Sequence, residues 1–138
     1  MHMKKILSFF ILIQFFVAGA AAQKQPEFTV VSFEEKPFDT SARDERYKVV
    51  DGNGELFSII KLVSYNAGDD LRAYSFDFGY CESRVKEVDG EVWLYVQRNA
   101  MRATIKRAGY RTLKYELSAT VQPGKVYEIG RASCRERV

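Results

Sequence analysis

The stretch Val88-Asp-Gly-Glu-Val-Trp-Leu-Tyr-Val96 decides the fold class of this chain. Asp89 and Gly90 are residue types that accept the positive φ of a type I′ turn, so they predict a two-residue hairpin connection. The segment from Val92 to Val96 carries apolar side chains on both faces, which is typical of a strand inside a sheet. The stretch therefore predicts a β-hairpin whose second strand is buried.

Outside this hairpin the period of two continues. The further strand candidates are residues 28–33, 56–63, 74–80, 103–107 and 125–127. In residues 74–80 all four aromatic side chains fall on one face, and Gln122-Pro-Gly-Lys125 predicts a second tight turn. No segment shows a sustained helical stripe. We expect an all-β, antiparallel β-sandwich of the immunoglobulin-like kind.

The amino-terminal residues 1–22 have the order of a secretory signal peptide. Lys4 and Lys5 precede an apolar run from Ile6 to Val17, and small residues follow as far as Ala22. The run is shorter than the ~20 residues of a membrane span. We expect cleavage before Gln23 and export to the periplasm, the cell surface or the medium.

The other end of the chain, Glu-Ile-Gly-Arg-Ala-Ser-Cys-Arg-Glu-Arg-Val over residues 128–138, matches one translated frame of a common sequencing-library adapter. Such scars are set aside in an argument about the fold. We therefore expect a module over residues 23–127, whose last strand is cut short at Tyr127, followed by an adapter-derived artefact.

Removing both ends changes the chemistry of the chain. Lys and Arg fall from 21 to 16 and Asp and Glu from 18 to 16, so the net charge falls from +3 to zero over the 105 residues of 23–127. Nucleic-acid binding usually needs a basic excess, so it is not expected. Cys134 is removed with the tail, which leaves Cys81 without an internal disulfide partner. We expect it to be a buried, small apolar side chain.

The same segment lacks the usual partners of catalysis. Its only candidate nucleophile, Cys81, has no histidine beside it, because the single histidine is His2. We expect no catalytic, cofactor-binding or metal-binding residues, no cofactor and no enzyme activity from this segment.

Two groups of acidic residues offer sharper hypotheses. Asp51-Gly-Asn-Gly-Glu55 resembles the opening of a calcium loop, but its sixth and twelfth positions are leucines. A hairpin connection is the preferred interpretation. The carboxylate pairs Glu34–Glu35, Asp69–Asp70 and Glu87–Asp89 could supply glycosidase acids only if folding brought them together. We expect them to be solvated.

Surface aromatic residues are the remaining functional candidates. Trp93 and Tyr95 lie on the face of their strand opposite Val92, Leu94 and Val96. They are core residues if both faces are covered, and a strip for sugars or a protein partner if one face is open. Tyr110, after a Gly turn, is a lesser candidate.

Several of these motifs together resemble the closing half of a PEGA-type domain, over about residues 81–127. They are Glu91–Val96, residues 103–110 with their Gly-Tyr turn, residues 117–121, and Pro-Gly-Lys-Val-Tyr127. Residues 28–79 resemble the first part of secreted bacterial proteins that begin with such a module, some of which continue into a domain similar to formylglycine-generating enzymes. The resemblance implies a non-catalytic, extracytoplasmic β-sandwich that contacts cell-wall or surface glycans.

Two functions follow as hypotheses. The first is a binding or scaffolding module of the bacterial cell envelope, with peptidoglycan, surface polysaccharide or envelope proteins as partners. The second is the amino-terminal accessory domain of a larger secreted enzyme.

Overall fold

The computed structural model describes residues 25–134, with side chains as far as Arg131, and it confirms an all-β sandwich. The predicted signal peptide over residues 1–22 lies outside the described residues. The strands are β1 (Glu27–Glu35), β2 (Ser58–Ser64), β3 (Ser75–Asp77), β4 (Ser83–Val88), β5 (Glu91–Val96), β6 (Arg102–Lys106), β7 (Leu113–Glu116) and β8 (Val126–Cys134). Two 3-10 turns, η1 (Ser41–Arg43) and η2 (Leu71–Ala73), are the only helical elements among these residues.

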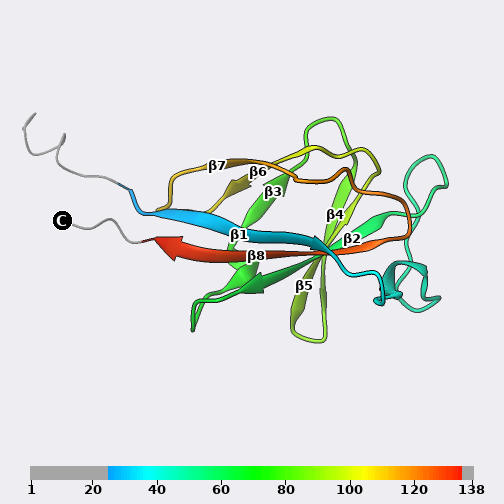
Figure 1. Ribbon diagram of the computed structural model, residues 1–138, viewed down its shortest axis with the longest axis horizontal. Coiled ribbons are helices and arrows are strands. Elements are labelled where there is room, and N and C mark those ends of the chain that lie inside the picture. The colour runs from blue at the N-terminus through cyan, green and yellow to red at the C-terminus, as the bar shows by residue number, and fades with distance from the viewer. Residues whose placement is uncertain (1–24, 135–138) are drawn as a thin grey trace, which may run out of the picture.

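The strands form two sheets. The larger has the order β1-β8-β2-β5-β4 and the smaller the order β3-β6-β7. Figure 1 shows β6 and β7 lying over the long β1–β8 ribbon. Neighbouring strands are antiparallel except β2 and β8, which are parallel from Ile59↔Val126 to Ser64↔Arg131. The last strand is thus inserted between the first two.

The predicted hairpin forms as the sequence indicates. β4 and β5 pair from Ser83↔Val96 to Val88↔Glu91, and Asp89 and Gly90 have φ of 51° and 84°. Both positive angles are those of a type I′ turn, whose twist matches that of the flanking strands. The second predicted turn is also present, because Lys125 N–H donates to the Gln122 carbonyl and Gly124 has φ of 70°.

The main core lies between the two sheets. Alternation on β5 points Val92, Leu94 and Val96 inward, where they meet residues of the smaller sheet such as Ala103 and Ile105. All five are at most 4% exposed. Burial of these side chains is the principal favourable contribution to folding, at about 1.5–3 kcal/mol for each large apolar one.

A second core covers the opposite face of the larger sheet. It consists of Ala42, Phe57, Ile59, Trp93, Tyr95 and Val126, with Tyr47, Val49 and Val88 packed against them. The cover comes from the connection between β1 and β2, residues 36–57, which we call the strap. Figure 1 shows it folding back beside the right-hand end of the larger sheet.

Two boundaries differ from the predictions. The strand expected over residues 74–80 ends at Asp77, because Gly79 has φ of 70° and turns the chain. Tyr80 therefore points into solvent instead of sharing a face with Tyr74 and Phe76. The strand expected over residues 125–127 is also longer, since β8 runs from Val126 to Cys134 along β1 and β2; the origin of residues 128–138 as a translated adapter stays a prediction.

The slot between β1 and β2 explains the longer strand. Backbone N–H and C=O groups of both neighbours point into it, and any extended segment there satisfies them, whatever its side chains. The side chains of β8 do not all suit this slot equally. Ile129 and Arg131 are both buried, but the Nε and one Nη of Arg131 have no hydrogen-bond partner among the described residues. No helix among residues 25–134 is long and apolar enough to cross a membrane.

Candidate functional site

Trp93 and Tyr95 are core residues, and the open aromatic strip considered from the sequence is not present. They are 4% and 1% exposed, beneath the strap. The Tyr95 hydroxyl donates to the Tyr47 carbonyl at 2.7 Å, and the Tyr47 ring meets Trp93 edge-on at 5.2 Å between centroids. Burial raises the pKa of Tyr95. Neither ring can stack on a sugar while the strap is in place.

Tyr110 lies on the other side of the larger sheet and is not brought to Trp93. It is half-buried, with its ring 5.9 Å from that of Phe28 and 4.9 Å from the Arg107 guanidinium. The three aromatic residues singled out from the sequence therefore do not form one surface. Cys81 is half-buried and its sulfur lies 3.9 Å from the Arg98 carbonyl, so it is less enclosed than expected.

The loop from Asp51 to Glu55 is a hairpin connection, as preferred from the sequence. The Asp51 carboxylate accepts hydrogen bonds from the N–H groups of Asn53 and Glu55 and from the Gln97 amide. These bonds, led by that from Glu55, lower the pKa of Asp51. Glu55 is paired with Arg98 at 3.3 Å. Both carboxylate oxygens of Asp51 and Glu55 Oε1 are thus already engaged.

Asp69 is not the solvated residue that the sequence suggested. Its side chain is 4% exposed, and its two oxygens contact Arg107 Nη1 at 2.9 Å and Arg131 Nη1 at 2.7 Å. The Tyr74 hydroxyl donates to the same carboxylate at 3.0 Å. Buried charges persist only when paired in this way. Asp69 therefore anchors the loop after β2 to the interior.

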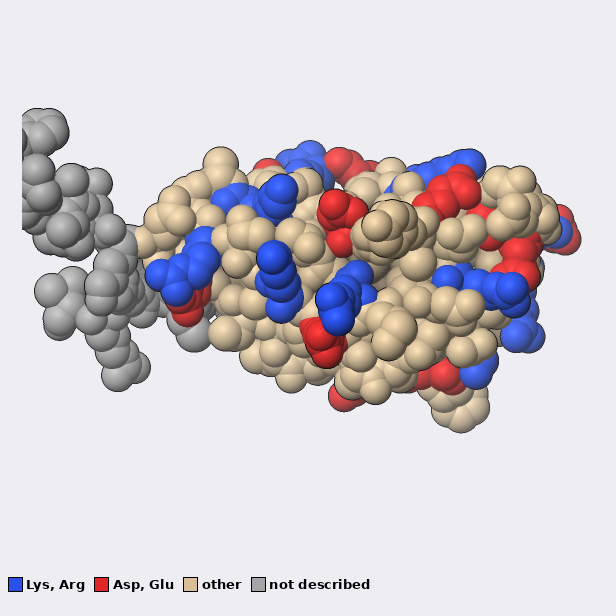
Figure 2. All heavy atoms as spheres, turned by 90° about the horizontal axis from the view of Figure 1, so that it is seen from above, with Lys and Arg blue, Asp and Glu red and all other residues tan. Residues whose placement is uncertain are grey.

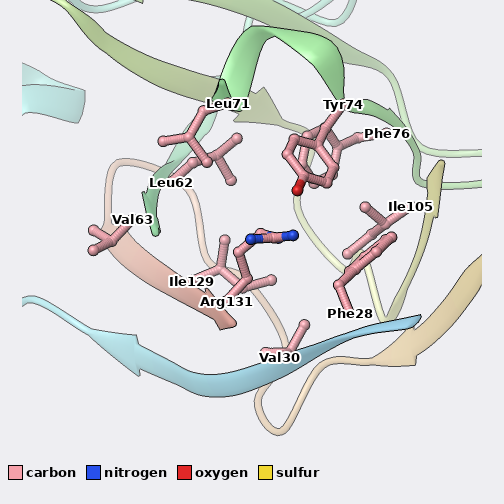
Figure 3. Close-up of a pocket in the computed structure, with 10 residues that line it drawn as sticks. All are labelled: Phe28, Val30, Leu62, Val63, Leu71, Tyr74, Phe76, Ile105, Ile129 and Arg131. Atoms are coloured by element: carbon pink, nitrogen blue, oxygen red, sulfur yellow. The ribbon is translucent and has the colours of Figure 1, made fainter. Parts of the chain in front are cut away.

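Behind this anchor lies a small apolar cavity of about 20 Å³. Figure 3 shows the Arg131 guanidinium among its lining side chains, with Phe28, Tyr74 and Ile105 on one side. The Arg131 guanidinium carbon is 4.7 Å from the Tyr74 ring centroid and 5.3 Å from that of Phe28. The cavity has room for about one water molecule and none for an organic ligand.

The next residue, Asp70, faces outward into a groove of about 480 Å³. The groove runs between the η2 loop and the β4–β5 hairpin. Its lining residues are Gly68, Asp69, Asp70, Leu71, Arg72, Glu87, Gly90 and Val92. Asp69 and Asp70 form one of the carboxylate pairs considered from the sequence, and Glu87 belongs to another pair. Folding has thus brought members of two pairs together that lie far apart in the sequence.

Arg72 stands between the two exposed carboxylates of the groove. Its Nε is 3.1 Å from Asp70 Oδ1 and 4.0 Å from Glu87 Oε1. The hydrogen bond from Arg72 lowers the pKa of Asp70, and the same contact raises that of Arg72. A glycosidase acid needs a raised pKa. The shift at Asp70 is in the opposite direction, and the groove presents charged and hydrogen-bonding groups at its surface.

Two almost fully exposed aromatic residues were not among the candidates predicted from the sequence. Phe38 is 96% exposed on the Lys36–Asp39 turn, and Tyr80 is fully exposed after β3. Both loops leave the end of the larger sheet at which β1 ends and β4 begins. Pro37 before Phe38 was the available signal, since proline fixes the second position of a turn and turns point side chains outward.

The charge of the surface is mixed. Figure 2 shows Lys and Arg side chains interspersed with Asp and Glu on the face in view.

Comparison of the chain with protein-family models, with curated proteins and with solved structures returned no match.

Proposed function

We propose that the chain is a non-catalytic binding module of the bacterial cell envelope, and that the groove between the η2 loop and the β4–β5 hairpin contacts a wall or surface glycan. The observation that carries the proposal is the pairing of Asp70, Arg72 and Glu87 across a groove of about 480 Å³. The volume lies within the range of small-molecule sites, about 300–1,000 Å³.

The chemistry of the groove suits hydroxyl groups. Asp70 and Glu87 accept hydrogen bonds, and the Arg72 guanidinium donates several in one plane. All three side chains are at least half exposed, at 51%, 58% and 65%, so they reach a ligand without rearrangement of the core. Half-buried Leu71 supplies apolar surface beside them.

The buried Asp69 supports the same proposal. Its bonds to Arg107 and Tyr74 fix the loop that carries Asp70, so the groove is held in one shape before any ligand arrives. A site formed in advance loses less conformational entropy on binding. The proposal that such a site lies outside the cytoplasm is supported by the predicted signal peptide and by the resemblance to PEGA-type domains.

The proposal is tested by retention on insoluble peptidoglycan and on immobilised surface polysaccharide. Wild type should be retained, and Asp70→Ala with Glu87→Ala should be released while its circular dichroism is unchanged. Glu91→Ala is the matched control, because alternation along β5 points this exposed carboxylate away from Val92 and the groove. Failure of wild type to bind any wall or surface glycan would contradict glycan binding.

A second function is favoured by Phe38 and Tyr80. Two nearly fully exposed aromatic rings on loops at one end of the larger sheet suit contact with another protein or domain. We propose this as the alternative: an accessory domain of a larger secreted enzyme, for example one similar to formylglycine-generating enzymes. Phe38→Ser with Tyr80→Ser should then abolish co-purification with that domain and leave glycan retention unchanged.

A further inference from the structure

The hairpin between Val50 and Leu56 carries an Asn-Gly pair at its tip. Asn53 and Gly54 are both exposed, and Gly54 has φ of 79°. We propose that Asn53 is a site of spontaneous deamidation and that Asp51 sets its rate. This inference does not depend on the glycan groove, which is formed by other loops.

The reaction needs only the chain and water. The Gly54 backbone nitrogen attacks the side-chain carbonyl carbon of Asn53, and a new N–C bond closes a succinimide ring. The bond from that carbon to the amide nitrogen breaks, and ammonia leaves with the proton given up by Gly54. Water then opens the ring at either carbonyl and leaves aspartate or isoaspartate at position 53.

Glycine at position 54 makes this nitrogen accessible. It has no Cβ to block the approach, and beyond its two neighbours in the chain no atom lies within 4 Å of where a Cβ would stand. Only the hydrogen bonds of the hairpin itself therefore protect Asn53 from attack by the Gly54 nitrogen.

The hairpin protects it through Asp51. The attacking nitrogen is engaged, because Gly54 N–H donates to the Asp51 carbonyl at 3.0 Å. The Asp51 carboxylate accepts the N–H groups on both sides of the reactive pair, from Asn53 at 2.8 Å and Glu55 at 3.0 Å. The Gln97 amide holds the same carboxylate at 3.1 Å. Ring closure requires rotation of the Asn53 backbone, which breaks these bonds.

Asn66 and Asn99 are internal references. They are the other two asparagines of the sequence, and each is followed by alanine, whose Cβ hinders the attacking nitrogen. Their own backbone N–H groups are bonded to Ser64 Oγ and to the Val121 carbonyl, both at 3.2 Å. We expect neither to react on the timescale of Asn53.

The product would loosen this end of the sandwich. A carboxylate at position 53 adds a negative charge beside Asp51 and near Glu82, which accepts the Gly52 N–H at 2.8 Å. Isoaspartate also adds one atom to the main chain, which is incompatible with the bond from Gly54 to Asp51. Deamidation thus converts a closed hairpin into an open, more acidic loop.

The test is incubation of the purified protein at slightly alkaline pH, followed by peptide mapping for the mass change from amide to acid and for isoaspartate. Conversion should occur at Asn53 and not at Asn66 or Asn99. Asp51→Ala should react several-fold faster than wild type, Gln97→Met should be intermediate, and the denatured wild-type chain should give the upper limit. Asn53→Gln should abolish the signal.

Two results would overturn the inference. The first is that, in the denatured chain, Asn53 is converted no faster than Asn66 and Asn99. This result would show that the Asn53–Gly54 pair is not especially reactive. The second is that wild type, Gln97→Met and Asp51→Ala all react at the same rate. This result would show that Asp51 does not set the rate of deamidation. Circular dichroism and Trp93 emission show whether each variant is folded. If Asp51→Ala is unfolded, it should react at the rate of the denatured chain, and the rate of Gln97→Met then decides whether Asp51 protects Asn53.

Discussion

The Lys61 ammonium nitrogen lies 4.2 Å from the centroid of the Trp93 ring and 2.6 Å from Asp39 Oδ2. Lys61 belongs to β2 and Asp39 to the strap, so this one side chain fastens the strap over the second core. The Lys61 side chain is only 15% exposed. A cation over an aromatic ring is worth more when it is partly removed from water.

Replacing Lys61 with Met should therefore loosen the strap. It removes the ion pair and the cation above Trp93, and it leaves Asp39 half-buried without its partner. We expect a loss of about 1–2 kcal/mol in the free energy of unfolding, measured by urea denaturation. The single tryptophan should also change its emission. Lys48→Met, which breaks an exposed pair with Glu45 at 2.8 Å, should change stability by less than about 1 kcal/mol; similar losses in both variants would contradict the role of Lys61.

Truncation of Trp93 measures the second core directly. Trp93→Ala should cost about 3–5 kcal/mol because it empties a site that is 4% exposed. Trp93→Phe should cost less, since it keeps a ring beneath Lys61. A folded Trp93→Ala protein with unchanged stability would show that the strap does not cover this residue in solution.

Asp69 and Asp70 provide a neighbouring pair with opposite roles. Asp69→Ala should cost about 3–5 kcal/mol, because it leaves the buried Arg131 and the partly buried Arg107 guanidinium groups without a counter-charge. Asp70→Ala should leave the melting temperature unchanged, because its side chain is half exposed. Thermal unfolding of both variants checks this, and equal melting temperatures would rule out the buried anchor.

The β4–β5 turn tests the register of the hairpin. Gly90 has φ of 84° and free space around the position of a Cβ, so any cost of Gly90→Val comes from the backbone alone. We expect about 1 kcal/mol or more. Gly90→Asn should cost less, because asparagine tolerates this region. An unchanged melting midpoint for Gly90→Val would count against a type I′ turn.

Acid should destabilise the strap. Burial alone would raise the pKa of Asp39, but hydrogen bonds from Lys61 and Ser41 outweigh it and the pKa is lowered. A lowered pKa in the folded state stabilises the protein above the unfolded value, about 3.9, and this contribution is lost as the pH falls through the folded value. Stability should therefore be flat near neutral pH and fall in acid, less steeply in Asp39→Asn. Equal slopes would exclude Asp39 as a contributor.

Calcium should have no effect on the melting temperature of wild type, since Asp51 and Glu55 already bind N–H groups and Arg98. A ligand that binds only the folded state must raise the melting temperature. A clear stabilisation by calcium that is lost in Asp51→Ala would show a cation site that the hairpin bonds conceal.

The turns and the central strand could be predicted from the sequence. Asp89-Gly90 and Pro123-Gly124 specify their turns through their own backbone preferences, and the alternation in residues 92–96 reflects a strand with both faces covered. These features depend on neighbours along the chain, so a single sequence contains them.

The tertiary structure decided what covers each face. Trp93 and Tyr95 became core residues because the strap, whose sequence has no regular period, folds across them. Asp69 became buried while Asp70 stayed exposed because Arg107 and Arg131, which are distant in sequence, meet the Asp69 carboxylate and do not pair with that of Asp70. The groove joins a loop after β2 to the β4–β5 hairpin in the same way. Alternation states which side chains share a face, but only long-range packing determines whether that face meets water, a strap or a ligand.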